Sequence, residues 1–270
     1  MARDKNGEFK CITGKQMGSL LLDYIFCALE EQGKMPSDAY AIKTIVTSEM
    51  ATKICEVHNV KLYNVLTGFK FIAEVIGEHE AKKEGTFLLG YEESYGYMKG
   101  QYSRDKDGVV ASMLICEMAA YYSLKGMTLI DAVESLYEKY GFYMENSAEI
   151  YMEGLDGKEK IAGLMDKLRA ETPEKLAGSR VVNIRDYLAE TSKNMLTGEV
   201  EGTGLPKSNV MYYKAENGCV VVARPSGTEP KIKFYILANG KNEEEAHNNT
   251  VDCTHTLEDM LGLAHDTLKK

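Results

Sequence analysis

A loop late in the chain carries side chains that suit the binding of a phosphate group. The stretch ARPSGTEPKIKFYI, residues 223–236, places the loop between two apolar strands. Its candidate ligands are Arg224, Ser226, Gly227 and Thr228. An arginine offers phosphate a planar fork of donors, the hydroxyls add two more, and a glycine allows close backbone approach. Glu229 disfavours an anion unless it points away, and an ordinary hairpin tip also needs glycine and proline. Both interpretations stay open on composition alone.

A second group of polar residues directly follows the apolar run TFLLG. Glu92, Glu93 and Ser94 stand there together. Carboxylate oxygens accept hydrogen bonds in pairs, which suits the vicinal hydroxyls of a sugar. The alternative is a solvated acidic loop, since loops are commonly charged.

Lys70 and a pair of aspartates are weaker candidates. Lys70 falls in the first turn of an expected helix, where the helix dipole disfavours a cation. It is either solvated or placed there to carry a proton. Asp105 and Asp107 could suggest a metal loop, but a helix follows at once, so capping is the expected role of Asp107. Arg104 faces either an anion or solvent.

The elements that would position these residues alternate in the first half of the chain. Apolar runs at 41–48, 60–66 and 86–90 predict strands, and helical periodicity predicts helices at 15–32, 49–59, 68–85, 107–126 and 128–141. This alternation predicts a largely parallel sheet covered by helices, with ligands beyond the carboxyl ends of its strands. Asn6 and Gly7 predict a turn, and the strand pairing across it would need residues before Met1.

The pattern changes after Gly141, so we expect two domains, 1–142 and 143–270. The second has expected strands at 142–153 and 180–188, helices at 158–171 and 242–263, and a mobile loop at 191–209. The fold class is therefore an α/β sandwich domain with a parallel sheet, followed by a smaller α+β domain.

Composition narrows the possible partners. The chain has 270 residues, 44% of them hydrophobic, and a net charge of -9, which argues against general nucleic-acid binding. Six dispersed cysteines without a CxxC pair favour reduced thiols, and neither a signal peptide nor a membrane-length apolar run is present, so the sequence predicts a cytoplasmic protein without a membrane partner. The five histidines lack the spacing typical of metal ligands, so no metal site is expected in this chain.

Three stretches together resemble a known family. They are TGFKFI at 67–72, GYEESYGY at 90–97 followed by RDKDG, and RPSGTEPKIKFY at 224–235. In order and spacing they are similar to the C-terminal half, the third and fourth domains, of an α-D-phosphohexomutase, closest to the phosphoglucomutase and phosphomannomutase group.

The resemblance implies a function and roles for individual residues. Such enzymes move phosphate between the 1- and 6-positions of a hexose through a bisphosphate, here glucose 1,6-bisphosphate, using a phosphoserine and Mg²⁺ held by earlier domains. Glu92 and Ser94 would bind sugar hydroxyls, with Glu93 as a further candidate, and Lys70 resembles the basic residue near the reacting centre. Arg224, Ser226, Gly227 and Thr228 would hold the distal phosphate. Tyr91 and Tyr95 depart from the family pattern, in which glycine is common at both positions.

Neither a serine loop nor a metal loop of this family is present in the sequence. In the family the metal loop lies just upstream of a stretch like RDKNGEF, so the resemblance implies a fragment of a longer enzyme, inactive alone, whose partners are a hexose phosphate and the N-terminal domains of the same polypeptide. The GEES-like stretch favours a phosphoglucomutase. The alternatives are a phosphomannomutase, a non-catalytic module that binds a phosphosugar, and a purely structural pair of domains.

Overall fold

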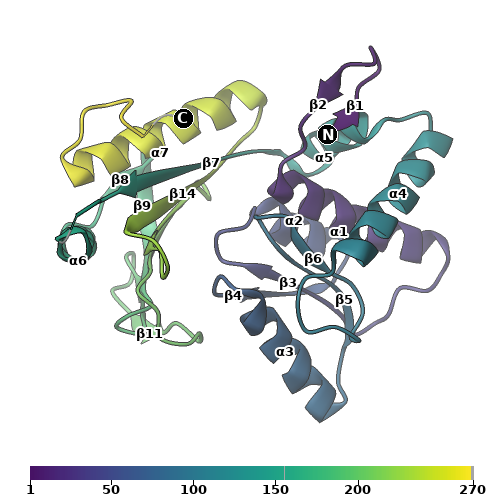
Figure 1. Cartoon of the computed structure of the whole chain (residues 1–270), viewed down its shortest axis with the longest axis horizontal. Coiled ribbons are helices and arrows are strands. Elements are labelled where there is room, and N and C mark those ends of the chain that lie inside the picture. The colour runs from purple at the N-terminus through teal and green to yellow at the C-terminus, as the bar shows by residue number, and fades with distance from the viewer. Residues whose placement is uncertain (155, 269–270) are drawn as a thin grey trace. The chain divides into compact units, whose positions relative to one another are not determined.

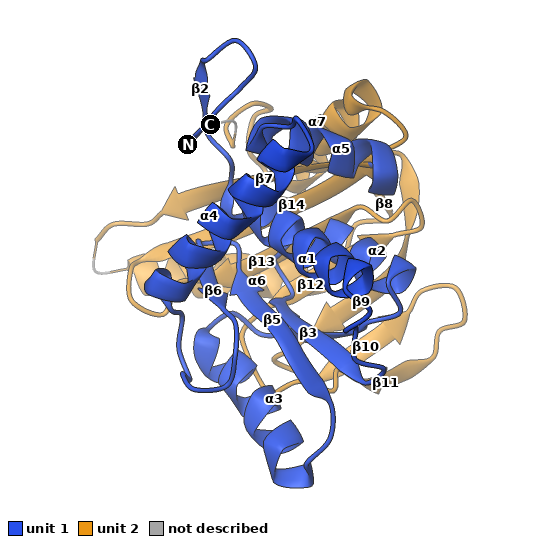
Figure 2. Ribbon diagram, turned by 90° about the vertical axis from the view of Figure 1, so that its right-hand side faces the viewer, with its two compact units in different colours: residues 1–141 blue, residues 142–270 orange. Residues whose placement is uncertain are grey.

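The chain is organised as two compact units. The computed structural model describes residues 1–154 and 156–268, and it divides the chain into Met1–Gly141 and a second unit that begins at Phe142. Figure 2 colours the two units separately. We describe each unit by itself. In the described part of the chain, no helix has the length and apolar character needed to cross a lipid bilayer.

The first unit is built on a four-stranded sheet with the strand order β4-β3-β5-β6. Its elements are β1 (Ala2–Arg3), β2 (Phe9–Lys10), α1 (Gly14–Glu31), β3 (Ala39–Thr44), α2 (Met50–Val57), β4 (Lys61–Val65), α3 (Phe69–Lys82), β5 (Thr86–Glu92), β6 (Gly96–Met98), α4 (Gly108–Leu124) and α5 (Leu129–Tyr140). Strand β3 pairs in parallel with β4 and β5, while β6 pairs antiparallel with β5. The expected parallel α/β domain is confirmed, and β6 is an addition that the sequence pattern did not reveal.

Helices cover both faces of this sheet, with α3 on one side and α1 and α2 on the other (Figure 1). On the α3 side, Phe69, Ile72 and Ile76 are buried in one apolar cluster with side chains of the strands, among them Ile42. Because alternate residues of a strand face opposite sides, Tyr91 of β5 points instead toward α1. The sheet is therefore fixed from both sides, which holds its carboxyl edge in place.

Side-chain caps set where three helices begin. Thr13 forms a capping box with Gln16 at the start of α1, and Thr128 forms one with Asp131 at the start of α5. Asp107 accepts hydrogen bonds from the first amides of α4, at 2.9 Å from Val109 N and 3.0 Å from Val110 N. The expected capping roles of Asp107 and Thr128 are confirmed.

The start of the chain corrects one expectation. Gly7 has a φ of 82° in the turn after Asp4, as the Asn-Gly pair predicted. The strand after this turn does not need residues before Met1, because Ala2 and Arg3 pair with Lys10 and Phe9. Two residues on each side of the turn form this short hairpin, so the expectation that the pairing requires residues before Met1 is wrong.

In its described residues, 142–154 and 156–268, the second unit has an antiparallel sheet of eight strands and two helices. Its elements are β7 (Phe142–Tyr151), α6 (Gly157–Ala170), β8 (Lys175–Leu176), β9 (Ser179–Asp186), β10 (Thr191–Asn194), β11 (Val200–Gly202), β12 (Met211–Ala215), β13 (Val220–Pro225), β14 (Lys231–Gly240) and α7 (Glu243–Leu261). The main path of the sheet runs β11-β10-β9-β12-β13-β14-β7, and β8 pairs with β9. This agrees with the expected α+β class.

Both helices of the second unit share one apolar core with the sheet. Ile232, Phe234 and Ile236 of β14 lie in the same cluster as Met165 of α6 and Leu257 of α7. The expected mobile loop at 191–209 is wrong in part, because β10 and β11 lie within it and pair with each other. Their Thr, Ser and Lys residues looked like loop, yet the pairing between neighbouring strands orders them.

Candidate functional site

Two carboxylates connect the loops at the carboxyl edge of the first unit's sheet. Glu92 ends β5 and Glu93 follows it in the turn toward β6. Glu92 reaches the loop after β4, and Glu93 reaches the end of β3. The structure therefore brings the carboxyl ends of β3, β4 and β5 together around Glu92 and Glu93, two of the residues that sequence analysis named as candidates.

Glu92 is buried, with only 8% of the residue exposed. Its Oε1 accepts a hydrogen bond of 2.6 Å from the backbone N–H of Gly68. Burial raises the pKa of this carboxyl, while the Gly68 amide opposes the rise and the charge of Glu93 adds to it. Burial disfavours the charged form of a carboxyl group, so a buried glutamate at the edge of a sheet is a candidate functional residue rather than a solvated loop residue.

Glu93 is held by a buried hydroxyl that sequence analysis missed. Its Oε2 accepts a hydrogen bond of 3.3 Å from Oγ1 of Thr44, the last residue of β3. Thr44 Oγ1 in turn lies 2.6 Å from Oγ1 of Thr47, and both threonines are fully buried. Ser94 is exposed at the tip of the turn. Glu92 and Glu93 thus have fixed positions, while the Ser94 hydroxyl is open to a ligand.

Helix α1 places the turn through two glycines. A Cβ on Gly14 would lie 2.0 Å from the carbonyl oxygen of Glu93, so only glycine allows this approach. A Cβ on Gly18 would lie 2.0 Å from the ring of Tyr91. The tyrosine that departs from the family pattern at position 91 is therefore accommodated by a glycine on the facing helix.

The second departure, Tyr95, keeps the backbone shape that glycine favours. Its φ is 64°, in the left-handed region, which an ordinary side chain adopts at a cost of about 1 kcal/mol. Its ring is exposed and its hydroxyl donates to the carbonyl of Ile12 at 3.3 Å. The side chain therefore alters the surface beside Ser94 without changing the path of the turn.

Lys70 is exposed in the first turn of α3, as expected. Its Nζ lies 4.7 Å from the ring centroid of Phe71, and among the described residues it makes no ion pair with a carboxylate. Gly68, the residue before this helix, has a φ of 122° and carries the amide that binds Glu92. Gly68 is two residues before Lys70 in the chain. Its hydrogen bond to Glu92 therefore keeps that carboxylate near the start of the helix that carries Lys70.

The residues around position 105 have structural partners. Arg104 forms an ion pair with Glu80, which leaves the charge of Arg104 engaged within the unit. Lys106, which sequence analysis did not single out, lies beside Glu92 and lowers the pKa of that carboxyl. A Cβ on Gly96 would lie 3.1 Å from Cδ of Lys106, so a glycine of β6 makes room for the lysine stem.

In the second unit, the loop after β13 is organised by Ser226. The Ser226 Oγ accepts hydrogen bonds from the amides of Thr228 and Glu229, at 3.4 and 3.3 Å. Gly227 does not adopt a positive φ, and a Cβ there would meet nothing within 4 Å. Gly227 thus contributes open space at an exposed tip rather than a left-handed turn.

Basic residues surround this loop, and its one acid is neutralised. Lys231 Nζ lies 2.9 Å from both Glu229 and Glu149, so Glu229 is turned into an ion pair. Arg224 pairs with Lys233 across β13 and β14, which places both side chains on the same face of the sheet. Lys233 is itself bound to Glu149 at 2.7 Å. The loop therefore borders a face where cations outnumber acids.

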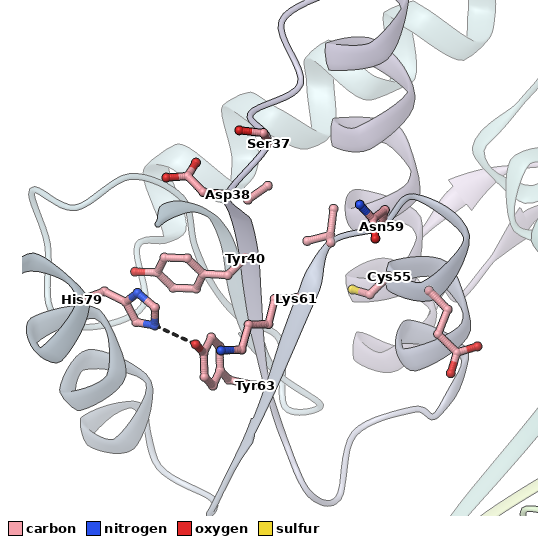
Figure 3. Close-up of a pocket in the computed structure, with 11 residues that line it drawn as sticks. Ser37, Asp38, Tyr40, Cys55, Asn59, Lys61, Tyr63 and His79 are labelled. Carbon is pink, nitrogen blue, oxygen red and sulfur yellow. Dashed lines mark hydrogen bonds between the residues drawn. The ribbon is translucent and has the colours of Figure 1, made fainter. Parts of the chain in front are cut away.

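A pocket of about 450 Å³ opens at the other edge of the first unit's sheet. Ala39 and Lys61, which begin β3 and β4, line it together with Tyr40, Tyr63 and His79 (Figure 3). The rings of Tyr40 and His79 stack at 4.2 Å, and His79 Nε2 lies 2.9 Å from the Tyr63 hydroxyl. The candidate carboxylates are at the carboxyl edge and do not line this pocket.

Comparisons with known proteins agree with this architecture. Residues 13–140 match the model of the phosphoglucomutase/phosphomannomutase α/β/α domain III. This match identifies the first unit as a domain of this class.

Curated relatives extend the similarity over both units. The phosphoglucomutases of Staphylococcus haemolyticus and Staphylococcus saprophyticus are each 35% identical to this chain, over 90% and 89% of its length. The chain spans 43% of the length of each of these relatives. The chain belongs to the α-D-phosphohexomutase family, and it corresponds to the C-terminal part of its members.

Solved structures support the fold. The pp63/parafusin phosphoglucomutase of Paramecium has a TM-score of 0.62 at 15% identity, covering 97% of this chain and 44% of that one. A phosphoglucomutase/phosphomannomutase family protein of Burkholderia thailandensis has a TM-score of 0.53 at 14% identity, covering 93% and 42%.

Proposed function

We propose that this chain is the sugar- and phosphate-binding part of a phosphoglucomutase, which interconverts glucose 1-phosphate and glucose 6-phosphate through glucose 1,6-bisphosphate. The observation that carries the proposal is the buried Glu92, held by the Gly68 amide at the carboxyl edge of a domain III fold. The identity to phosphoglucomutases over nine-tenths of the chain favours this reaction over that of a phosphomannomutase.

Each unit has a separate task in this proposal. In the first unit, Glu92 and Glu93 accept hydrogen bonds from sugar hydroxyls, Ser94 offers its hydroxyl, and Lys70 carries charge or a proton near the reacting phosphate. In the second unit, the binding group for the distal phosphate consists of Arg224, Ser226, Gly227 and Thr228. Binding energy from the distal phosphate and the hydroxyls would hold the intermediate while the other phosphate reacts.

The reaction of this family uses Mg²⁺, and the described residues do not offer it a fitting site. Among them, the group of His, Cys, Asp and Glu whose ligand atoms lie within 4.8 Å of one another is Asp23, Cys27 and His58. A thiol and an imidazole are poor ligands for Mg²⁺, which takes oxygen. In this proposal, the N-terminal domains of the whole enzyme supply the Mg²⁺ site and the phosphoserine.

The test is a turnover assay with glucose 1-phosphate. The 270-residue chain is assayed alone and then mixed with separately produced N-terminal domains of a staphylococcal relative, since the chain spans 43% of those proteins. We expect turnover only in the mixture, and a mixture with Glu92→Gln should lose most of it. Turnover by the chain alone would refute the assignment of phosphoryl transfer to other domains. Faster turnover of mannose 1-phosphate than of glucose 1-phosphate by the mixture would identify a phosphomannomutase instead.

A further inference from the structure

A second cluster of ionisable side chains lies in the first unit, away from the carboxyl edge of the sheet. Asp23 and Cys27 stand one helical turn apart on α1, and His58 caps the end of α2. Asp23 is nine residues after Gly14, so it lies about 14 Å along the helix from the turn that bears Glu93. We infer that Asp23, Cys27 and His58 form a binding site for a zinc-class transition-metal ion.

The three ligand atoms are close to the separations that a bound ion needs. Asp23 Oδ1 lies 3.8 Å from His58 Nε2 and 3.8 Å from Cys27 Sγ. A tetrahedral zinc ion with bonds of about 2.0–2.3 Å sets its ligands about 3.3–3.5 Å apart. Small side-chain rotations would close that difference, and a water molecule can complete such a three-residue site.

His58 is oriented as metal-binding histidines are. Its Nδ1 lies 2.8 Å from Oε1 of Glu30, so the ring N–H donates to a carboxylate there. Nε2 faces Asp23 and lies 3.0 Å from the oxygen of Tyr140, whose own proton is donated to Asp23, so a metal ion at Nε2 would displace the Tyr140 hydroxyl from this nitrogen. A carboxylate behind the imidazole fixes the tautomer and strengthens the nitrogen as a ligand. The His58 side chain is only 6% exposed, which limits its rotation.

The side chain of Lys139 already places a positive charge beside Asp23 and Cys27. The ammonium of Lys139 lies 2.8 Å from Asp23 Oδ1 and 3.7 Å from Cys27 Sγ. The Lys139 side chain is 43% exposed, so it can move into water without unfolding α5. Metal binding would exchange one cation for another: the ammonium leaves intact, and the Cys27 thiol releases its proton to solvent as the sulfur–metal bond forms.

The ligand types select the ion. Thiolate and imidazole favour zinc and related transition metals, whereas Mg²⁺ prefers oxygen. The alternative is a purely structural cluster, because the Tyr140 and Tyr122 hydroxyls also donate to Asp23. A metal site predicts tighter Zn²⁺ binding once the competing Lys139 ammonium is removed. A purely structural cluster predicts no such gain, so a Lys139 variant distinguishes the two interpretations.

The experiment titrates the 270-residue chain with Zn²⁺, and with Cd²⁺ as an ultraviolet probe of thiolate ligation. We expect one equivalent to bind with a sulfur-to-metal absorption band, and Zn²⁺ to raise the melting temperature. Cys27→Ser should lose the band and weaken Zn²⁺ binding by at least about 100-fold. Loss of a residue that only supports a metal ligand already costs about 10- to 100-fold, and Cys27 would bind the metal directly. The matched control is Cys116→Ser, which changes an exposed thiol on α4 and should leave both readouts intact.

The variant Lys139→Gln separates the two interpretations. Removing the competing ammonium should tighten Zn²⁺ binding by about two- to fivefold, the range of a partly exposed ion pair. Weaker binding in Lys139→Gln, or a Cys27→Ser variant that binds Zn²⁺ as the parent does, would overturn the proposal. These readouts do not involve catalysis, so they stand or fall separately from the proposed phosphoglucomutase reaction.

Discussion

The close approach of α1 to the turn after β5 yields a sharp prediction for Gly14→Ala. The added Cβ would lie 2.0 Å from the carbonyl oxygen of Glu93 and 2.9 Å from the amide nitrogen of Tyr95. Both neighbours are backbone atoms, so neither can rotate away as a side chain would. The substitution therefore acts on the position of the turn that bears the candidate sugar ligands.

The size of the effect follows from these distances. Ordinary van der Waals contact begins at about 3.4 Å, so the turn must move by at least about 1.4 Å from α1. Overpacking of this kind costs about 1–3 kcal/mol of the free energy of unfolding. A misplacement of about 1 Å can slow a catalysed step by as much as about 100-fold, and hydrogen bonds to a sugar weaken for the same geometric reason. We therefore expect a moderate loss of stability and a larger loss of glucose 6-phosphate affinity.

The assay is urea denaturation followed by circular dichroism, together with calorimetric titration of glucose 6-phosphate. The matched control is Gly77→Ala in α3, where a Cβ meets nothing within 4 Å and φ is not positive. That variant should gain about 0.5–1 kcal/mol, because alanine restricts the unfolded chain more than glycine does. If Gly14→Ala is as stable as the parent and binds as tightly, the proposed placement of the turn by α1 is wrong.

The remaining predictions concern a cap and two carboxylates. Asp107→Ala should destabilise the first unit by about 1 kcal/mol in urea denaturation because α4 loses its cap, whereas Asp105→Ala, which removes an exposed partner of Lys106, should change little. The two lysines bonded to Glu149 lower its pKa from 4.5 to about 2, so its stabilisation is present above pH 4.5 and is lost as the pH falls toward 2. Allowing for solvent screening, Glu149→Gln should cost about 1 kcal/mol at neutral pH, and a cost that persists at pH 2 would contradict this assignment. Burial raises the pKa of Glu92, so ionisation of this carboxyl destabilises the fold as the pH rises through its folded pKa. Glu92→Gln should therefore melt higher than the parent at neutral pH and lose that advantage at about pH 4; a lower melting temperature at neutral pH would speak against this cost of burial.

Local patterns in the sequence predicted most of the elements. The strand and helix alternation before Gly141 gave the parallel sheet, and the caps at Asp107 and Thr128 act within one helical turn. The hairpin of β13 and β14 was visible because its apolar residues alternate in a regular way. These signals depend on neighbours in the chain, which is why they survive without knowledge of the tertiary structure.

What the sequence could not predict depends on residues far apart in the chain. Strand β6 follows a turn-like run, and only its pairing with β5 makes it a strand. The Thr44 contact to Glu93 joins two strand ends, and no local pattern marks it. The same holds for His58, which meets Asp23 because α1 and α2 pack together. The left-handed backbone of Tyr95 was hidden for another reason, since a tyrosine seldom signals such a turn.

The most direct test of the proposed binding roles compares two ligands in two variants. Calorimetric titration of the chain with glucose 6-phosphate and with inorganic phosphate would be repeated for Arg224→Ala and Glu92→Gln. We predict that Arg224→Ala weakens the binding of both ligands, because both carry phosphate, and that Glu92→Gln weakens only the binding of the sugar phosphate. Equal affinities for glucose 6-phosphate in the parent and both variants would contradict the account.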